Sequence, residues 1–463
     1  MIRLFSHYVP RNTLIIALLE AFLLASSVYV GVLIWAEFFA DGSVSGWLEP
    51  ASAFALVMLG AMLVMGLYGQ GSVEGWAGTF FRLVAAFLVG LPILYAFHLV
   101  ISPDIWPGAP AGISAALALT VISAERLAFT RWKQASLLRP RVLVLGTGSR
   151  AAQIDRLLRA SQTGTMPLVV GFVPVKEVEH DVPDRYLLRP AAGESLVDMV
   201  DRYKVSEVVV GVRDRRGGGI PVQELLDCRL RGITVTELSS FFERESGQIR
   251  LESLNSSWLI FGEGFRQNWL RTVIKRGFDV SVSAALLLIT LPVMLLTALI
   301  ILLTMGSPVL YRQERVGQGG RIINIYKFRS MRNDAETNGA QWARSNDDRT
   351  TPFGRFIRKF RIDELPQIIN VFKGEMSFVG PRPERPEFVR DLSEQIPYYD
   401  ARHSIKPGIT GWAQVRYPYG ASVHDSREKL QYDLYYVKNH TLFLDLAILM
   451  QTVEVVVWRR GSR

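Results

Sequence analysis

Four long apolar stretches near the start of the chain constrain its fold more than any other feature. They run over Thr13–Ala36, Ala51–Tyr68, Phe80–Ile101 and Ala111–Leu127. A helix needs about 20 mostly apolar residues to cross the core of a bilayer. A cleaved signal peptide would be shorter than the first stretch, and further apolar stretches would not follow it. We therefore expect residues 1–135 to form an α-helical bundle of four membrane spans rather than a soluble helical bundle.

Positive residues are unevenly distributed around these stretches. The chain has 52 Lys and Arg against 43 Asp and Glu, a formal net charge of +9. Arg3 and Arg11 precede the first stretch, and Arg126, Arg131 and Lys133 lie at or beyond the end of the fourth. The charged residues of the loop after the first stretch are all acidic. Because Lys and Arg concentrate on the cytoplasmic side of membrane proteins, we expect both ends of the bundle to be cytoplasmic.

The next segment has the order strand, glycine turn and helix. After an apolar run from Arg141 to Leu145, Gly146 permits a tight turn and Gly148 permits close backbone approach; Ala151 takes the third position of the motif, and a helical pattern follows over Gln153–Leu158. Further strand signals follow at Leu168–Phe172, Glu207–Gly211 and Ile233–Thr236. These signals predict a Rossmann-like parallel α/β domain over residues 136–262.

Binding of a dinucleotide to this domain is the weaker interpretation. A ribose-binding carboxylate is expected at the end of the second strand, about 20 residues after the glycine turn, but the first acidic residue beyond that strand, Glu177, comes later. We therefore favour a structural or regulatory module and expect no requirement for NAD.

A fifth apolar run, residues 280–305, is long enough to cross a membrane but has two features that argue against a simple span. Pro292 lies in its middle, where it breaks or kinks a helix. Both flanks are basic, which places both ends of the run on one face of the membrane. We expect a re-entrant membrane helix hairpin broken at Pro292, with a spanning helix as the alternative. The hairpin keeps the remaining residues on the cytoplasmic side.

Two adjacent carboxylates, Asp363 and Glu364, stand just before a helical pattern of apolar residues. Pro366 is tolerated only in the first turn, so the helix is expected to start near Asp363. A helix N-terminus favours ionised carboxylates and anionic ligands, and Arg358 and Arg382 are close in sequence. The pattern is compatible with a metal and phosphate site, and also with a helix-capping Asp among solvated neighbours.

Several motifs in the last 200 residues resemble one protein family. They are Gly306-Ser-Pro308, Lys327-Phe-Arg-Ser-Met331, Asp363-Glu-Leu-Pro-Gln367, Gly374-Glu-Met-Ser-Phe-Val-Gly-Pro-Arg-Pro383 and Lys406-Pro-Gly-Ile-Thr-Gly-Trp-Ala-Gln-Val415. Over residues 268–463 they resemble, in order, the bacterial sugar transferases, which are monotopic polyprenyl-phosphate phosphoglycosyl transferases of exopolysaccharide and O-antigen synthesis. The bundle and the α/β domain resemble the large members. The sequences over Arg361–Gln367 and Pro383–Phe388 resemble those of the subgroup associated with PEP-CTERM/exosortase polysaccharide systems.

The resemblance implies that residues 263–463 form a mainly α (α+β) catalytic domain at the cytoplasmic face of the bacterial inner membrane. It implies transfer of a sugar-1-phosphate from a nucleoside-diphosphate sugar to polyprenyl phosphate, through a covalent intermediate on Asp363. Asp363 and Glu364 would hold Mg²⁺ or Mn²⁺. Residues implied to bind the phosphates are Lys327, Arg329, Arg358 and Arg382.

Other functions remain as alternatives. A membrane-anchored nucleotide-sugar dehydratase or epimerase would carry a Tyr-x-x-x-Lys pair, which this chain lacks. A non-catalytic polysaccharide assembly factor would not need the intact Asp363-Glu364 pair. Nucleic-acid binding is a third alternative, but the chain lacks the pattern of basic and aromatic residues that such a groove would carry. The sequence leaves open the identity of the sugar and whether the chain forms a homodimer.

Overall fold

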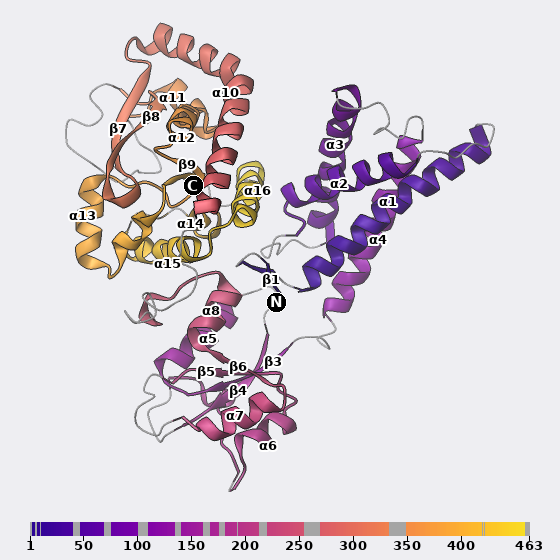
Figure 1. The fold of residues 1–463 in the computed structure, drawn as a ribbon, viewed down its shortest axis with the longest axis vertical. Helices are drawn as coiled ribbons and strands as arrows, with labels where there is room; N and C mark the ends of the chain where they lie inside the picture. The colour runs from indigo at the N-terminus through magenta and orange to yellow at the C-terminus, as the bar shows by residue number, and fades with distance from the viewer. Residues whose placement is uncertain are drawn as a thin grey trace. The chain divides into compact units, whose positions relative to one another are not determined.

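A computed structural model describes most of the chain. The described residues are 2–4, 7–9, 11–39, 47–68, 76–100, 110–134, 140–160, 167–175, 181–191, 193–212, 220–253, 269–332, 349–418, 420 and 422–458. The chain forms two compact units (Figure 1), one of residues 1–2 and 9–246, the other of residues 3–8 and 247–463. A short pair of strands, β1 (Ile2–Leu4) and β2 (His7–Val9), precedes the first helix.

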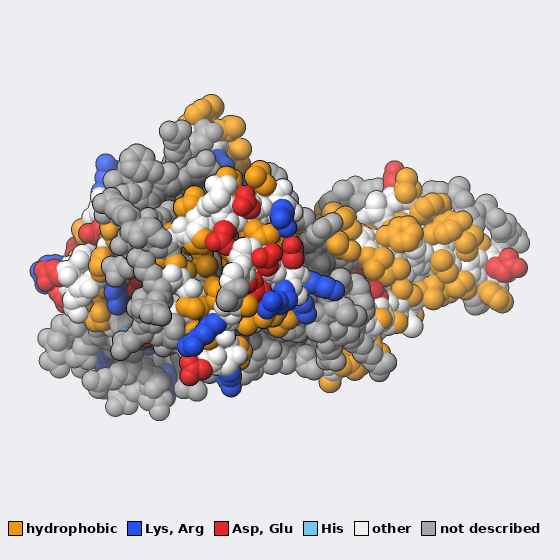
Figure 2. All heavy atoms as spheres, turned by 90° about the horizontal axis from the view of Figure 1, so that it is seen from below, with side chains coloured by type: hydrophobic (Ala, Val, Ile, Leu, Met, Phe, Trp, Pro, Cys, Tyr) orange, Lys and Arg blue, Asp and Glu red, His pale blue; other side chains and the backbone are white. Residues whose placement is uncertain are grey.

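The four apolar stretches at the start of the chain are helices. These are α1 (Arg11–Phe39), α2 (Leu48–Val64), α3 (Trp76–Val100) and α4 (Ala111–Gln134). Three of them, α1, α3 and α4, contain segments long and apolar enough to cross a membrane, and α2 is a shorter apolar helix. The stretch expected to reach Tyr68 ends as a helix at Val64, because Gly66 turns the chain with a φ of 77°. Hydrophobic side chains cover most of the described surface of these helices in Figure 2, as lipid-facing surfaces require.

One charged residue of the bundle differs from the expectation. Arg126, counted above among the flanking positive residues, points into the bundle. Its guanidinium donates to both carboxylate oxygens of the fully buried Glu20, at 2.7 and 3.1 Å, and to the backbone oxygen of Leu67. The Tyr68 hydroxyl also donates to Glu20. Arg126 therefore joins α1, α4 and the end of α2, as charges inside membrane bundles do when they are paired.

The α/β domain has the expected parallel sheet. Its strands are β3 (Arg141–Leu145), β4 (Leu168–Val173), β5 (Glu207–Val210) and β6 (Thr234–Glu237), and they lie in the order β4-β3-β5-β6. Its helices are α5 (Ser149–Ala160), α6 (Leu196–Arg202), α7 (Val222–Leu230) and α8 (Leu238–Ser246), with a 3₁₀ turn η2 (Asp184–Tyr186). The order second-first-third-fourth is that of flavodoxin-like sheets and differs from the Rossmann order, so "Rossmann-like" describes the layers but not the strand order.

The glycine turn after β3 has the expected local geometry. Gly146 has a φ of +117°, a conformation that favours glycine, and its N–H donates to Val173. Space for a side chain remains around Gly148, whereas Ala151 is fully buried against Gly211. The turn is therefore built as the pattern requires, and nucleotide binding there stays a prediction.

The second unit begins with residues that the sequence assigned to the α/β domain. Ile249 and Leu251, the latter being the first residue of the short turn η3 (Leu251–Ser253), lie in the hydrophobic core of this unit. The long helix α10 (Trp269–Met305) follows and contains Pro292. Figure 1 shows α10 bending between its two ends. The structure thus has one bent helix that begins before the apolar run, and a re-entrant path through a membrane stays a prediction.

The remainder of this unit is mainly helical with two small sheets. The strands β7 (Leu310–Val316) and β8 (Ile322–Phe328) form an antiparallel hairpin around η4 (Gln318–Gly320), and β9 (Ser377–Val379) pairs in parallel with β10 (Gly408–Thr410). The helices and 3₁₀ turns are α11 (Pro352–Lys359), η5 (Ile362–Glu364), α12 (Gln367–Lys373), α13 (Pro386–Gln395), η6 (Tyr399–Ser404), α14 (Trp412–Arg416), α15 (Val423–Asn439) and α16 (Leu442–Trp458). Buried Trp412, Leu434 and Ile448 place the core between α14, α15 and α16.

Candidate active site

The chain turns sharply just before the two carboxylates. Arg361 has a φ of 58°, which ends α11 and starts the 3₁₀ turn η5 that contains Asp363 and Glu364. The helix α12 begins only at Gln367, with Pro366 as its N-cap. The expected helix start at Asp363 is therefore wrong by four residues, because the tighter 3₁₀ turn satisfies the backbone first.

A buried asparagine joins this segment to the strand that carries Lys327. Asn370 of α12 is fully buried. Its side-chain oxygen accepts from the N–H of Tyr326 at 3.1 Å, and its amide nitrogen donates to the carbonyl of Asn324 at 2.7 Å. The side chain thus fixes α12 against β8, and Lys327 extends from β8 toward Glu364.

Three cations surround Glu364. Lys327 Nζ lies 3.2 Å and Arg382 Nη2 lies 3.4 Å from the same carboxylate oxygen, and Arg361 Nη1 lies 3.5 Å from the other. Burial by itself raises the pKa of Glu364, but Lys327, Arg382 and Arg361 outweigh burial and hold the pKa well below its usual range. Glu364 therefore stays ionised and is engaged on both oxygens.

Asp363 has different surroundings from Glu364. Its side chain is 8% exposed, and within the described part of the chain no hydrogen bond or ion pair reaches it. Burial, together with the negative charge of Glu364, raises the pKa of Asp363 to about 6, against the opposing charges of Lys327 and Arg358. A buried carboxylate that is ionised at neutral pH and has no partner is available for nucleophilic attack.

Two of the remaining predicted phosphate ligands have different surroundings. Arg358 lies close enough to Asp363 to lower its pKa, and it donates to the hydroxyl of Thr350 at 3.0 Å. Arg329 does not join this cluster. Its guanidinium donates to the backbone oxygens of Met305, Gly306 and Ser307. These carbonyls end α10 and begin the turn after it, so Arg329 acts there as a buried C-terminal cap.

The backbone of the Arg382 loop is fixed by residues that the sequence reasoning missed. Arg402 donates to the carbonyl of Arg382 at 3.0 Å and forms a buried ion pair with Asp433 at 2.8 Å. Arg315 donates to the carbonyl of Pro383 at 3.1 Å. Arg402 and Asp433 are 31 positions apart, and no local pattern in the sequence indicates the pair.

The two carboxylates differ in their fit to a divalent cation. The described residues contain no group of three or more His, Cys, Asp or Glu side chains able to hold a metal. Magnesium is commonly bound by one or two carboxylates together with phosphate oxygens of a substrate. Asp363 fits such a site because its carboxylate is buried and has no hydrogen bond or ion pair within the described part of the chain. Glu364 fits it less well, because cations already occupy both of its oxygens.

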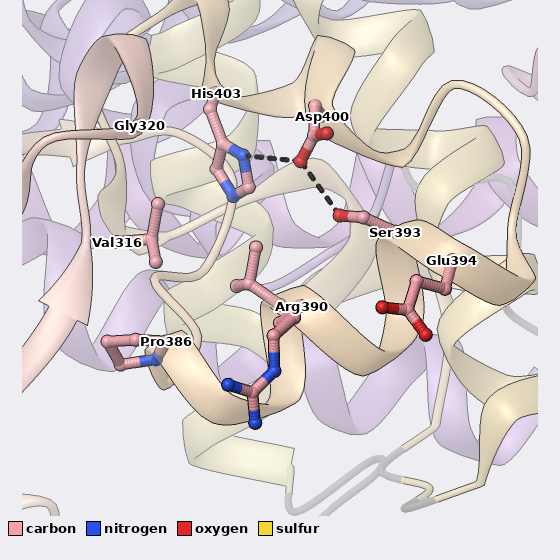
Figure 3. A pocket seen from close by; sticks show the side chains of 9 residues that line it. Val316, Gly320, Pro386, Arg390, Ser393, Glu394, Asp400 and His403 are labelled. Carbon is pink, nitrogen blue, oxygen red and sulfur yellow. Dashed lines mark hydrogen bonds and ion pairs between the residues drawn. The ribbon is translucent and has the colours of Figure 1, made fainter.

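A concavity of about 460 Å³ lies elsewhere in this unit, beside α13 and η6 (Figure 3). There Asp400 accepts from the Ser393 hydroxyl at 2.8 Å and lies 3.6 Å from His403 Nδ1. Burial and the charge of Arg402 lower the pKa of His403 to about 4, so the ring is neutral at pH 7. Asp400 lies between the other two side chains, which is not the order of a nucleophilic triad. None of the predicted site residues lines this concavity.

Comparison with known proteins places the family match in the second unit. The sequence profile of a family described as "Bacterial sugar transferase" matches residues 270–459. The "UDP-N-acetylgalactosamine-undecaprenyl-phosphate N-acetylgalactosaminephosphotransferase" of Aeromonas hydrophila is 40% identical over 256 residues, 55% of this chain and 60% of that protein.

Two further relatives cover different shares of their own lengths. The "UDP-glucose:undecaprenyl-phosphate glucose-1-phosphate transferase" of Escherichia coli (strain K12) is 31% identical over 264 residues, 56% of each chain. The "Exopolysaccharide production protein PSS" of Rhizobium leguminosarum bv. phaseoli is 40% identical over 187 residues, 39% of this chain and 94% of that protein. The chain thus spans less than two thirds of the Aeromonas and Escherichia proteins and almost all of the Rhizobium protein.

Proposed function

This chain belongs to the bacterial sugar transferase family, and from that premise we propose that it transfers a sugar-1-phosphate from a nucleoside-diphosphate sugar to polyprenyl phosphate in the inner membrane. The relatives named for such a reaction use UDP-linked sugars and undecaprenyl phosphate. The observation that carries the proposal is the contrast between Asp363, which has no hydrogen bond or ion pair among the described residues, and Glu364, which is engaged on both oxygens. One relative is named for exopolysaccharide production. We propose that the reaction of this chain is the first membrane-bound step of such a synthesis.

The reaction has two steps, and Asp363 takes part in both. In the first, a carboxylate oxygen of Asp363 attacks the phosphorus that bears the sugar. The bond from that phosphorus to the bridging oxygen breaks, and nucleoside monophosphate leaves with the bond electrons. In the second, an oxygen of the lipid phosphate attacks the same phosphorus. The bond to Asp363 breaks, which restores the carboxylate and yields polyprenyl-diphosphate-sugar.

Positive charge at the site is suited to this chemistry. A phosphoryl group in transfer spreads negative charge over its outer oxygens, and fixed cations nearby stabilise that charge. Lys327 and Arg382 are held at Glu364 and are therefore oriented before any ligand binds. We assign the donor diphosphate to Lys327, Arg358 and Arg382. A Mg²⁺ or Mn²⁺ ion on Asp363 and the donor phosphates would neutralise further charge.

The four apolar helices α1, α3, α4 and α10 fit a protein whose acceptor is a membrane lipid. We place the catalytic unit on the cytoplasmic face, where nucleotide sugars are made, in agreement with the positive residues that flank the bundle. Placement in the subgroup associated with PEP-CTERM/exosortase systems stays a prediction from the motif wording.

The test uses the full chain in membranes with polyprenyl phosphate and a panel of UDP-sugars, among them glucose, galactose and N-acetylated amino sugars. Wild-type protein is expected to release UMP, and Asp363→Asn is expected to release none. Release of UDP would show transfer of the sugar alone and would refute the proposal. A chelator is expected to suppress UMP release and added Mg²⁺ to restore it.

A further inference from the structure

A buried network joins the membrane helix α10 to the strand that leads into the Arg382 loop. Lys275 Nζ of α10 lies 2.6 Å from a carboxylate oxygen of Asp445, 3.3 Å from the carbonyl of Val379 and 3.4 Å from the hydroxyl of Tyr436. An ammonium has three protons, so each has an acceptor. The Tyr436 hydroxyl is also within 3.0 Å of the Val379 carbonyl and bonds to Asp445. Asp445 and Tyr436 are each 1% exposed.

The next turn of α10 contacts the same strand and the helix α12. Asp279 is 2% exposed and accepts from the Ser377 hydroxyl at 3.0 Å and from the N–H of Phe378 at 3.3 Å. Arg276 donates to two carbonyls at the C-terminal end of α12. The start of a helix with an otherwise apolar sequence is therefore fixed to both segments that carry the site, β9 before Arg382 and α12 after the carboxylates.

This network bears on Arg382 because Val379 is only three residues before it. The strand β9 has three residues and is paired with β10 on one side, and α10 is one of the helices that pack against it. Arg382 reaches Glu364 from the loop that follows. We infer that Lys275, with Tyr436 and Asp445, is a positioning residue of the active site, which fixes the Val379 carbonyl and thereby orients Arg382 toward the donor phosphates. This inference rests on the proposed function.

The test replaces the ion pair by apolar side chains of similar size. Lys275→Met alone would leave the buried Asp445 unpaired, and the variant could fail to fold for that reason. The double variant Lys275→Met/Asp445→Leu removes both charges and the Lys275 donor to Val379, and it leaves the Tyr436 hydroxyl as the remaining donor to that carbonyl. Buried ion pairs often tolerate such an apolar replacement. The matched control is Arg250→Met/Glu428→Leu, a partly exposed pair in the same unit at 3.7 Å. Lys275→Arg keeps the charge and the donors.

The readout is UMP release at varied donor and lipid concentrations, together with thermal unfolding. We expect the double variant to unfold near the wild-type temperature and to lose about ten- to a hundredfold in kcat/KM for the donor, because small misplacements of a catalytic group cost that much. The KM for the lipid should stay within twofold. The control should match wild type, and Lys275→Arg should keep most of the wild-type rate of UMP release.

A comparison with Arg382→Ala separates positioning from general loosening of the fold. A residue that acts through Arg382 adds no further loss once Arg382 is absent, whereas an independent structural defect multiplies the losses. Multiplied losses, or wild-type kinetics in a folded double variant, would overturn the inference. Absence of UMP release from wild type and control alike would instead refute the proposed function.

Discussion

Asp363→Asn is expected to abolish activity and at the same time to stabilise the protein at neutral and alkaline pH. The pKa of Asp363 is raised from 3.8 to about 6, chiefly by burial and by Glu364. Between these values the folded protein holds a proton that the unfolded chain has already lost. At about 1.4 kcal/mol per pK unit, ionising Asp363 in the fold therefore costs about 3 kcal/mol of unfolding free energy.

The sign of the effect follows from that cost. It is present in full above pH 6 and vanishes below pH 3.8, so the variant should be the more stable protein at pH 8 and should match wild type near pH 4. Denaturant unfolding of both proteins in the same detergent, at both pH values, measures the difference. Asp391→Asn, at a carboxylate 62% exposed, is the control and should show no difference at either pH.

Two results would refute the reasoning. A variant no more stable than wild type at pH 8 would mean that Asp363 is solvated or paired. An equal gain at both pH values would mean that the substitution acts through packing rather than through charge. Either result would remove the electrostatic argument for Asp363 as the poised nucleophile, even if the variant were inactive.

Three further predictions concern its surroundings. Glu364→Gln removes a negative charge that raises the pKa of Asp363, so the acid limb of UMP release against pH should move to lower pH; an unchanged limb would contradict the assignment. Arg402→Met should cost about 3–5 kcal/mol in denaturant unfolding by leaving Asp433 buried and unpaired, and Arg402→Met/Asp433→Leu should recover most of it. Arg329→Met should lower the unfolding temperature yet leave the donor KM within about twofold, because Arg329 caps a helix end rather than the phosphates.

The membrane helices and the glycine turn could be predicted, because the sequence features that determine them lie within a short stretch of chain. The long apolar runs of α1, α3 and α4, and the order of strand, glycine turn and helix around Gly146, can be recognised from neighbouring residues alone. The start of α10 was missed because Lys275 and Asp279 interrupt the apolar run. Asp445 pairs with Lys275, and Ser377 and the Phe378 N–H hydrogen-bond Asp279, and such distant partners cannot be recognised from the neighbouring sequence.

The same limit applies within the site. The Asp363-Glu364 pair could be found from its motif, but the left-handed backbone at Arg361 could not, because that conformation usually favours glycine. Arg329 and Arg382 look alike in sequence as basic residues within motifs. The structure separates them, because one faces the carbonyls that end α10 and the other faces Glu364.

The different ion pairing of the two adjacent carboxylates explains how Asp363 can react while Glu364 does not. A lone buried aspartate beside three cations would be held in ion pairs and would be a poor nucleophile. Here Glu364 engages Lys327, Arg382 and Arg361, so these cations stay concentrated at the site without pairing with Asp363. When a donor diphosphate arrives, its oxygens can share these cations, while Asp363 keeps a free lone pair for the phosphorus. Before substrate binds, the negative charge of Glu364 therefore holds these cations in the positions where the donor phosphates would later contact them.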